Sequence, residues 1–464
     1  MNHQQYPHTD DQICPQESLT VQDYEYYCRP ALVGLLKTID LDVVYERGEG
    51  DYLWQRKGKE LVKVLDLVGG YGANLFGHHH PELVAQAQQF FSHQLPFLAP
   101  GSCRRGAATL AKRLSALVGD YITLFTNSGT ETIEAAIKHI YLERKRPLFW
   151  AVKGSFHGKT LGAMQLTWST ADNSHIHALQ VHHLDPHDPS SWATMSLEVS
   201  EVAAIFLEPI QGEGGIKEHP QGFLHWLLTI AQEHDIPIVS DEIQTGMGRT
   251  GTFLASTTLG IDADYICLSK ALGGGLTKIG ALMIKRHRFM ADFSLKQTST
   301  FAEDDMSCFV ALKALEILKR DRLPQRCARV GRDFLRALAA LKDRFPQQIK
   351  EVRGQGLMIG VELQDQSQSS SSGLRMFSQN GYFGYLAAAY FLHVHRIRVM
   401  PTLSQPLTLR IQPSAYIREL ELNRFIEALT CFCQAVQALD LVHLTSFQVG
   451  VPAKAIAQLK NPPS

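Results

Sequence analysis

Lys270 has the position in this chain that most suggests chemistry. It follows the largely apolar segment Ala263–Ser269 and precedes the glycine-rich segment Ala271–Gly275. A lysine at the end of a buried strand is partly desolvated, and desolvation disfavours the charged ammonium form. The neutral amine is a nucleophile that can form a Schiff base with an aldehyde. Because most lysines at strand ends simply reach solvent, the role of Lys270 depends on the residues expected beside it.

Two other expected strand ends carry residues that suit an anionic, planar ligand. The strand Tyr121–Thr126 is followed closely by the small residues of Ser128–Thr130, immediately before an expected helix. Free N–H groups at a helix N-terminus bind phosphate, although Ser and Thr are also ordinary helix caps. The next strand leads into Phe156 and His157, which stand between two glycines. A ring there could lie flat against a planar ligand.

Carboxyl and amide side chains follow the third and fourth expected strands. Glu208 and Glu213 stand on a glycine-rich loop, where they could bind a metal ion, pair with a cationic substrate or hold an arginine. Asp241 and Gln244 follow the next strand, and an aspartate there could pair with a protonated ring nitrogen. Pyridoxal phosphate needs a Schiff-base lysine, an acidic partner for its pyridinium nitrogen, an anion site and a surface for the ring. The strand ends together supply that set.

The elements that must position these residues alternate between strand and helix from about residue 105 to residue 290. The expected strands are Tyr121–Thr126, Leu148–Val152, Val202–Leu207, Ile236–Ser240, Tyr265–Ser269 and Ala281–Ile284. Such alternation predicts an α/β fold whose mainly parallel sheet is covered on both sides. Ligands of these sheets bind outside the carboxyl ends of the strands. The residues singled out above are therefore expected to meet at one edge.

The length of 464 residues predicts more than one domain. We expect a flexible leader over 1–20 and an N-terminal segment over 21–95 that contributes to a small domain. A large cofactor-binding domain is expected over 96–330, a small α+β domain over 331–440 and a tail without an assigned role over 441–464. Within these ranges we expect a hairpin over Tyr52–Asp66 and long helices over Ser307–Arg320 and Gln325–Phe345.

Composition and charge argue against several classes of partner. Lys and Arg total 45 against 46 for Asp and Glu, so no net field favours nucleic acid or an anionic membrane. No apolar stretch is long enough for a membrane span, and the N-terminus lacks the pattern of a secretory signal. Eight scattered cysteines fit a reducing compartment, and we expect a cytoplasmic protein. We expect no metal site, because five histidines lack zinc-ligand spacing and are placed in a connecting loop: His175, His177, His182, His183 and His187.

Taken together, the motifs resemble those of the class III aminotransferases. This family of pyridoxal-phosphate enzymes includes ornithine, acetylornithine, diaminobutyrate and other ω-amino transferases. The resemblance spans about residues 25–435, and its motifs are Gly77–Pro81, Asn127–Glu131, Ser155–Gly158, Glu208–Gly215, Asp241–Gln244, Ser269–Gly275, Thr300–Phe301 and Arg410. It implies a fold-type-I α/β transferase, with a mainly parallel seven-stranded-type sheet in the large domain and a smaller α+β domain.

The resemblance also implies which residues bind pyridoxal phosphate. Lys270 would hold the cofactor as a Schiff base and then carry the substrate proton, and Asp241 would pair with the ring nitrogen. Thr300 matches a threonine that completes the phosphate site of the partner subunit, which implies a homodimer with shared active sites. The remaining cofactor contacts are expected from Ser128, Gly129 and Thr130 near the phosphate, Phe156 and His157 near the ring, and Gln244 near the phenolic oxygen.

A second set of residues is implied to bind the substrate. Arg410 matches the arginine that binds the α-carboxylate of the amino donor, for which the bidentate guanidinium is well suited. Glu213 matches the glutamate that pairs with this arginine when an ω-amine enters instead. Glu208 and Tyr71 are also expected at the substrate. The resemblance thus implies transamination between an α-amino acid such as glutamate and an aldehyde or keto acceptor, or an ω-amine.

The chain departs from the family pattern near the expected subunit contact and channel mouth. Ala302–Asp305 stands where many members have Gly-Gly-Asn-Pro, Gln297 replaces a common histidine and Lys278 replaces a usual proline. These changes leave the cofactor set intact, but the specific donor and acceptor stay open. Two alternatives also stay open. One is an intramolecular aminomutase or racemase with the same cofactor, and the other is a non-catalytic scaffold, against which Lys270 and Asp241 argue.

Overall fold

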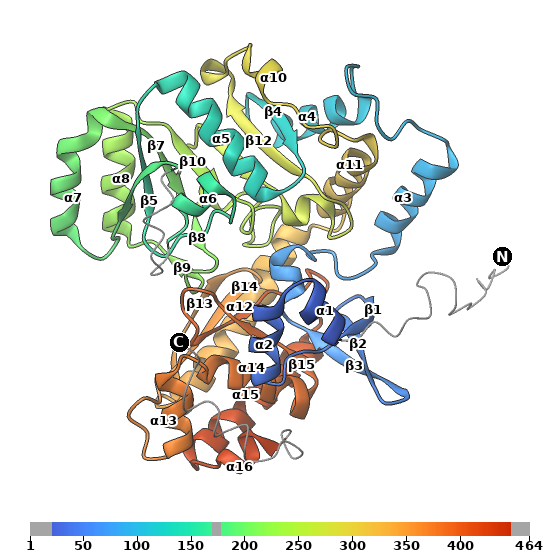
Figure 1. Cartoon of the computed structure of the whole chain (residues 1–464), viewed down its shortest axis with the longest axis vertical. Coiled ribbons are helices and arrows are strands. Elements are labelled where there is room, and N and C mark those ends of the chain that lie inside the picture. Colours follow the sequence, from blue (N-terminus) through green and yellow to red (C-terminus); the bar gives the residue numbers. More distant parts are fainter. Residues whose placement is uncertain (1–20, 169–177, 447–464) are drawn as a thin grey trace.

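The computed structural model of the chain describes residues 21–168 and 178–446. Figure 1 shows two bodies, one built on a seven-stranded sheet and the other on smaller sheets that lie below it in this view. The expected α/β architecture with a second, smaller domain is confirmed. No helix in the described part of the chain is long and apolar enough to cross a membrane.

The large sheet is mixed but mainly parallel. Its strand order is β4-β12-β11-β10-β7-β5-β6, and β12 runs antiparallel to both of its neighbours. Every residue of β5 and β7 is buried, as expected for strands covered on both faces. The bounds are β4 Tyr121–Thr126, β5 Leu148–Val152, β6 Gln180–Leu184, β7 Val202–Leu207, β10 Ile238–Asp241, β11 Tyr265–Leu268 and β12 Gly280–Lys285.

The expected strands match β4, β5 and β7 in full and β11 and β12 to within one residue at each end. Two expectations need correction. The fourth strand begins at Ile238, two residues later than expected, and includes Asp241 as its last residue. The histidine-rich segment is not a connecting loop throughout, since His182 and His183 lie on β6. This strand is at the sheet edge and only its last residue is buried, so it lacks the apolar run that marks its neighbours. His175 and His177 lie outside the described residues.

Helices cover both faces of the large sheet. On one face, α5 packs Ile133, Ile137 and Ile140 against strand residues such as Phe149 and Phe206. The alternate residues of the same strands face the core that α4, α8 and α11 share. The helices connected with this sheet are α3 Pro81–Ser92, α4 Arg105–Val118, α5 Gly129–Arg144, α6 Leu161–Leu166, α7 Pro189–Met195, α8 Gln221–Glu233, α9 Ala255–Thr258, α10 Phe293–Lys296 and α11 Asp305–Arg320.

The smaller body combines the N-terminal segment with the C-terminal part of the chain. The predicted hairpin is β2 and β3, and β3 pairs in parallel with β15, placing Leu65 beside Ile397. One small sheet has the order β1-β2-β3-β15 and another has the order β13-β14-β17-β16. Their bounds are β1 Tyr45–Glu49, β2 Tyr52–Lys57, β3 Glu60–Asp66, β13 Ile349–Gln355, β14 Met358–Leu363, β15 Ile397–Arg398, β16 Met400–Pro401 and β17 Thr408–Ile411.

The remaining helices complete this body, and the start of the expected tail belongs to it. Leu444, on the last described helix, is fully buried, and Tyr390 Oη lies 3.1 Å from His443 Nε2. The tail therefore begins as packed structure. The helices are α1 Val21–Tyr27, α2 Pro30–Thr38, α12 Leu323–Arg344, α13 Ser372–Gln379, α14 Phe383–His395, α15 Glu419–Gln437 and α16 Leu441–Leu444.

Arg249 connects the two bodies through hydrogen bonds to backbone carbonyl groups. Its fully buried guanidinium donates to the carbonyl oxygens of Leu357 at 2.9 Å, Pro413 at 3.0 Å and Gly72 at 3.2 Å. Burial lowers its pKa to about 10. The three acceptors come from segments far apart in the sequence, and one of them, Gly72, is adjacent to Tyr71. Arg249 thus fixes how the small domain sits on the loop that follows β10.

Candidate active site

Lys270 stands at the carboxyl edge of the large sheet, just beyond β11. It opens a 3-10 turn, Lys270–Gly273, with φ at +46°, a conformation that costs free energy for a residue with a β carbon. Burial lowers the pKa of Lys270 to about 8, against the opposing effects of Glu213 and Asp241. A half-buried amine with this pKa is partly neutral near physiological pH and can act as a nucleophile or exchange a proton.

Asp241 lies on the neighbouring strand, in register with Cys267, three residues before Lys270. Its carboxylate is almost fully buried and has two neighbours that fix its orientation. Oδ2 lies 2.7 Å from His157 Nδ1, and Oδ1 accepts the backbone N–H of Ile243 at 3.1 Å. Among the described residues, buried His157 Nε2 has no hydrogen-bond partner. The sequence-predicted ring partners Asp241 and His157 are therefore in direct contact.

The Ser128–Thr130 segment forms the N-terminus of α5, the position that binds anions. Ser128 is the cap, and its Oγ accepts the N–H of Glu131 at 3.3 Å. Thr130 Oγ1 lies 2.8 Å from Thr160 Oγ1. Gly158 has φ +138°, and a β carbon there would lie 2.2 Å from Thr130 Oγ1, so only glycine permits this approach. Thr160 was not predicted, because nothing in its local sequence distinguishes it.

Glu208 holds Phe156 in place through the backbone. Its two carboxylate oxygens accept the N–H groups of Phe156 at 2.8 Å and Gly212 at 3.0 Å. Burial raises the pKa of Glu208 to about 7, although His157 opposes the shift. The contacts of Glu208 are to the loops around the site, so the expectation that it binds substrate stays a prediction.

Gln244 forms a hydrogen bond with Gln412, a residue that the sequence pattern does not single out. Its Oε1 accepts a hydrogen bond from Gln412 Nε2 at 3.0 Å, and Gln412 is fully buried. A β carbon on Gly212 would lie 2.2 Å from Gln244 Oε1, so the glycine-rich loop passes close to the same group. Gln412 lies two residues beyond Arg410, and the contact links the cofactor side of the site with the small domain.

Arg410, Glu213 and Tyr71 form one cluster, although they come from three distant segments. The Arg410 side chain is 1% exposed and its Nη2 forms an ion pair with Glu213 Oε2. The ring of Tyr71 lies 4.7 Å from the Arg410 guanidinium carbon. Among the described residues, Arg410 Nε and Nη1 are buried without a hydrogen-bond partner. The guanidinium therefore has donors without acceptors, which suits the binding of a substrate carboxylate.

Tyr71 and Glu213, the other two members of this cluster, are set by a strained turn and by the charge of Arg410, respectively. Tyr71 has φ +55° in the turn Gly69–Gly72, and Asp66 Oδ1 accepts the N–H groups of Val68 at 3.1 Å and Gly69 at 3.3 Å at its start. For Glu213, burial would raise the pKa, but Arg410 outweighs this effect and the pKa is lowered. Glu213 is thus an anion that neutralises Arg410.

Thr300 is exposed in this single chain. Its neighbour Ser299 accepts a hydrogen bond from Asn127 Nδ2 at 2.9 Å, so the loop passes beside the Ser128–Thr130 segment. The departure at Ala302–Asp305 has a structural consequence. Asp304 caps α11 through the N–H of Ser307 at 2.7 Å, and Asp305 accepts the N–H of Gly106 at 2.8 Å near the start of α4.

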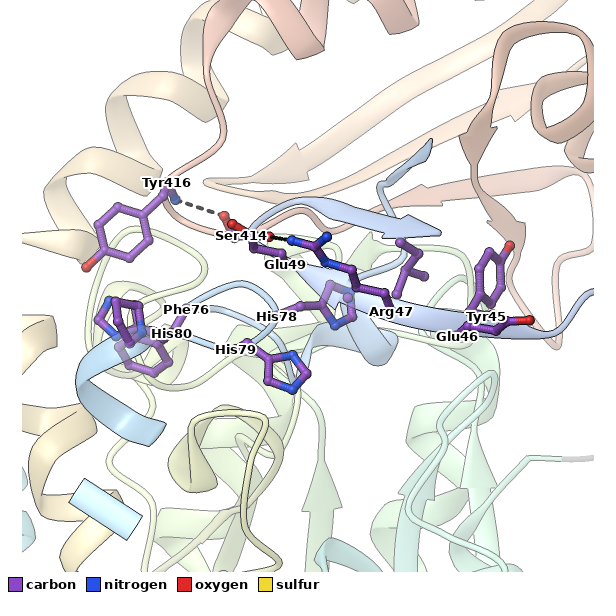
Figure 2. A pocket seen from close by; sticks show the side chains of 14 residues that line it. Tyr45, Glu46, Arg47, Glu49, Phe76, His78, His79, His80, Ser414 and Tyr416 are labelled. Carbon is purple, nitrogen blue, oxygen red and sulfur yellow. Dashed lines mark hydrogen bonds and ion pairs between the residues drawn. The ribbon is translucent and has the colours of Figure 1, made fainter. Parts of the chain in front are cut away.

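A separate hollow of about 900 Å³ lies between the β1–β2 hairpin and the start of α3 (Figure 2). His78, His79 and His80 line it. His78 exchanges two backbone hydrogen bonds with Gly50, and its Nε2 lies 2.9 Å from Asp66 Oδ2. No group of three or more His, Cys, Asp or Glu residues in the described ranges could hold a metal ion.

The site residues fit pyridoxal phosphate. The helix N-terminus at Ser128–Thr130 suits the phosphate. The backbone of Gly158 approaches Thr130 there more closely than a residue with a β carbon could. Asp241 is buried at the next strand from Lys270, where it can face a protonated ring nitrogen. The depressed pKa of Lys270 suits capture of the aldehyde.

Comparison with known proteins places the chain in a family. The model of the family Aminotransferase class-III matches residues 37–428, and the chain belongs to this family. It is 30% identical to Aminotransferase PigE from Serratia sp., a match that covers 90% of this chain and 54% of that protein. The chain therefore spans about half the length of this curated relative.

Solved structures share the fold. The ornithine aminotransferase from Toxoplasma gondii has a TM-score of 0.75 and 24% identity, with 91% of this chain and 97% of that chain covered. A 6-fold mutant of a thermostable omega transaminase from Pseudomonas jessenii has a TM-score of 0.78 and 22% identity, with coverage of 92% and 99%. An amine transaminase from an uncultivated Pseudomonas species in its PLP-bound form has a TM-score of 0.71 and 23% identity, with coverage of 83% and 93%.

Proposed function

We propose that this protein is a pyridoxal-phosphate-dependent aminotransferase. The observation that carries the proposal is the half-buried Lys270, with its pKa lowered to about 8, beside buried Asp241 on the adjoining strand. Membership of the class III aminotransferases supports it. When bound, pyridoxal phosphate supplies an aldehyde and an electron-withdrawing ring that stabilises negative charge on the substrate carbon.

The residues of the large domain would bind and orient this cofactor. Ser128, Gly129 and Thr130 would bind its phosphate at the N-terminus of α5. Phe156, held through its backbone by Glu208, would lie against the ring. Asp241 would face the ring nitrogen, with its orientation fixed by His157. Gln244 would lie near the phenolic oxygen, supported by Gln412.

Lys270 would serve both as the attachment point and as the proton carrier. A pKa of about 8 leaves part of the Nζ population neutral near physiological pH, and a neutral amine can accept a proton from the substrate carbon. Glu213 and Asp241 raise the pKa against the effect of burial, so a protonated Nζ is also accessible. One group can therefore accept and return a proton within a turnover.

Arg410 and Glu213 would select between two substrate types. Arg410 suits an α-carboxylate because its guanidinium is buried and has unpartnered donors among the described residues. A substrate without a carboxylate there leaves the Arg410–Glu213 ion pair intact. We therefore propose an α-amino acid such as glutamate as one partner and an ω-amine, aldehyde or keto acid as the other.

We propose a homodimer in which Thr300 completes the phosphate site of the partner subunit. Thr300 and Phe301 are exposed at the end of the loop that passes Asn127. Phe91 is 63% exposed on α3, and Leu95 and Phe97 follow it at the surface. Exposed apolar side chains in this number are typical of a surface that another chain covers.

The decisive experiment for the activity is a single-turnover half-reaction. The holoprotein is mixed with an amine and no acceptor, and the conversion of the pyridoxal form to the pyridoxamine form is followed by absorbance. We expect release of a carbonyl product equimolar with the converted cofactor. Isomerisation of one substrate without carbonyl release would instead indicate a mutase or racemase.

A further inference from the structure

Glu213 accepts two hydrogen bonds on one carboxylate oxygen, and both donors belong to a single hairpin of the small domain. Oε2 accepts from Arg410 on β17 and from the backbone N–H of Leu403, at 2.9 Å, in the turn between β16 and β17. The next N–H, of Ser404, donates to the backbone carbonyl of Glu213 at 3.0 Å. The strand and its turn therefore hold the same residue of the large domain.

Backbone hydrogen bonds fix the turn that presents the Leu403 amide. Thr402 N–H donates to the carbonyl of Thr408 at 2.9 Å, and Thr402 Oγ1 donates to the carbonyl of Gln405 at 2.8 Å. Thr402 is fully buried, whereas the Leu403 side chain is 54% exposed. The amide of Leu403 is thus held in place by its neighbours, and its own side chain contributes little.

This arrangement affects any substrate carboxylate that binds Arg410. Arg410 Nη2 is occupied by Glu213, and Nε and Nη1 are buried. A carboxylate must therefore displace Glu213, and Glu213 then loses the Leu403 amide as well as the guanidinium. Hydrogen bonds to a charged group are stronger than neutral ones, so the second bond adds materially to the free energy of displacement. A substrate without that carboxylate disturbs neither bond.

We infer that the backbone amide of Leu403 determines substrate preference by holding Glu213 on Arg410. It disfavours α-amino acids and favours amines and aldehydes that lack an α-carboxylate. The inference rests on the proposed function, because it concerns the substrate pocket of that activity.

The matched pair Leu403→Pro and Leu403→Ala isolates the amide. Proline removes the N–H, whereas alanine keeps it and removes only the exposed side chain. The probe is pentanoate, a carboxylate that does not turn over, titrated into the holoprotein and followed at the cofactor absorbance band. We expect pentanoate to bind about tenfold more tightly to the proline variant than to the alanine variant, as for loss of one hydrogen bond to a charged group.

Half-reactions with L-norleucine and n-pentylamine, which differ only in the α-carboxylate, provide the second readout. The proline variant should shift kcat/KM toward norleucine by a similar factor, while pentylamine changes little. In a Glu213→Ala background the proline substitution should have no further effect, because the group that it releases is absent. If the effect persists in that background, the turn is merely distorted and the inference fails.

Thr402→Val keeps the inference testable if the proline variant does not fold. It removes the Thr402 Oγ1 hydrogen bond that supports the turn, and we expect a smaller change in the same direction. Equal pentanoate affinity for wild type, this variant and Leu403→Ala would overturn the inference. Failure of the proposed function looks different, since no amine would then convert the cofactor in the wild type while the pentanoate series could still be measured.

Discussion

The cofactor side and the substrate side of the site are built in different ways. Lys270, Asp241 and the Ser128–Thr130 segment stand at the carboxyl ends of adjacent strands or at the helix that follows, within one sheet. Arg410, Glu213 and Tyr71 come from a small-domain strand, a loop and a strained turn. The first set is fixed by the sheet, whereas the second contains the Arg410–Glu213 ion pair, which we propose that a substrate carboxylate displaces.

We expect this difference to separate the residues needed for turnover of every substrate from the residues that determine which substrate is preferred. Substitutions on the cofactor side should reduce turnover of every substrate, because all substrates use the same attachment and proton transfer. Substitutions on the substrate side should instead change the ratio between substrate types.

Lys270→Ala should cause the largest loss. We expect the half-reaction rate to fall by about 10²–10⁴-fold for amino acids and simple amines alike, because a positioned acid–base group is removed. Lys59→Ala, which alters an exposed lysine in the turn between β2 and β3, should leave the rate unchanged. Stopped-flow absorbance with both substrate types measures the effect, and a loss confined to one type would contradict the separation.

Asp241→Asn should lower the rate by about 10²–10³-fold, since it removes a preorganised charge from a buried site. The loss should again be the same for both substrate types. Asp262→Asn is the matched control, because Asp262 is 88% exposed and pairs with Lys285 at the surface. If Asp241→Asn weakens only substrates with an α-carboxylate, Asp241 belongs to the substrate side.

Arg410→Ala should lower kcat/KM for α-amino acids by about 10–100-fold, the effect of losing a hydrogen bond to a charged group. Simple amines should lose much less, and the cofactor absorbance spectrum should stay the same. Arg410→Lys should fall between wild type and Arg410→Ala, because lysine keeps the charge but not the bidentate geometry. An equal loss of kcat/KM for amino acids and amines would contradict the role assigned to Arg410.

The smallest expected effect is the pH dependence of cofactor capture, which should report the environment of Lys270. Burial lowers its pKa to about 8, so the nucleophilic neutral amine is scarce below that pH and predominates above it. The rate at which the apoprotein captures pyridoxal phosphate should rise with pH and level off above about pH 8. A rate that is still rising steeply near pH 10 would show an ordinary, solvated lysine.

The sequence places the proposed cofactor-side residues at one sheet edge because they occur in short contiguous motifs at strand ends. Three expected strands match the structure in full, and their apolar runs are the strongest signal in the chain. The half-exposed edge strand β6 carries no such run and was missed. For this reason the sequence pattern predicts a loop at His182 and His183, which lie on β6.

The substrate side was harder to predict because contacts between distant segments define it. The family resemblance implied that Glu213 and Arg410 pair, but nothing local indicated that Leu403 or Gln412 would join them. Leu403 contributes through its backbone amide, which residue type does not reveal. Gln412 matters through its contact with Gln244 across 168 positions of sequence.

Covalent trapping tests the central claim most directly. Borohydride reduction of the holoprotein, followed by peptide mass spectrometry, locates the lysine that holds the cofactor. The account predicts one cofactor-modified peptide containing Lys270, and no modified peptide or cofactor absorbance band in Lys270→Ala. A modified peptide without Lys270, or a band that survives this substitution, would contradict it.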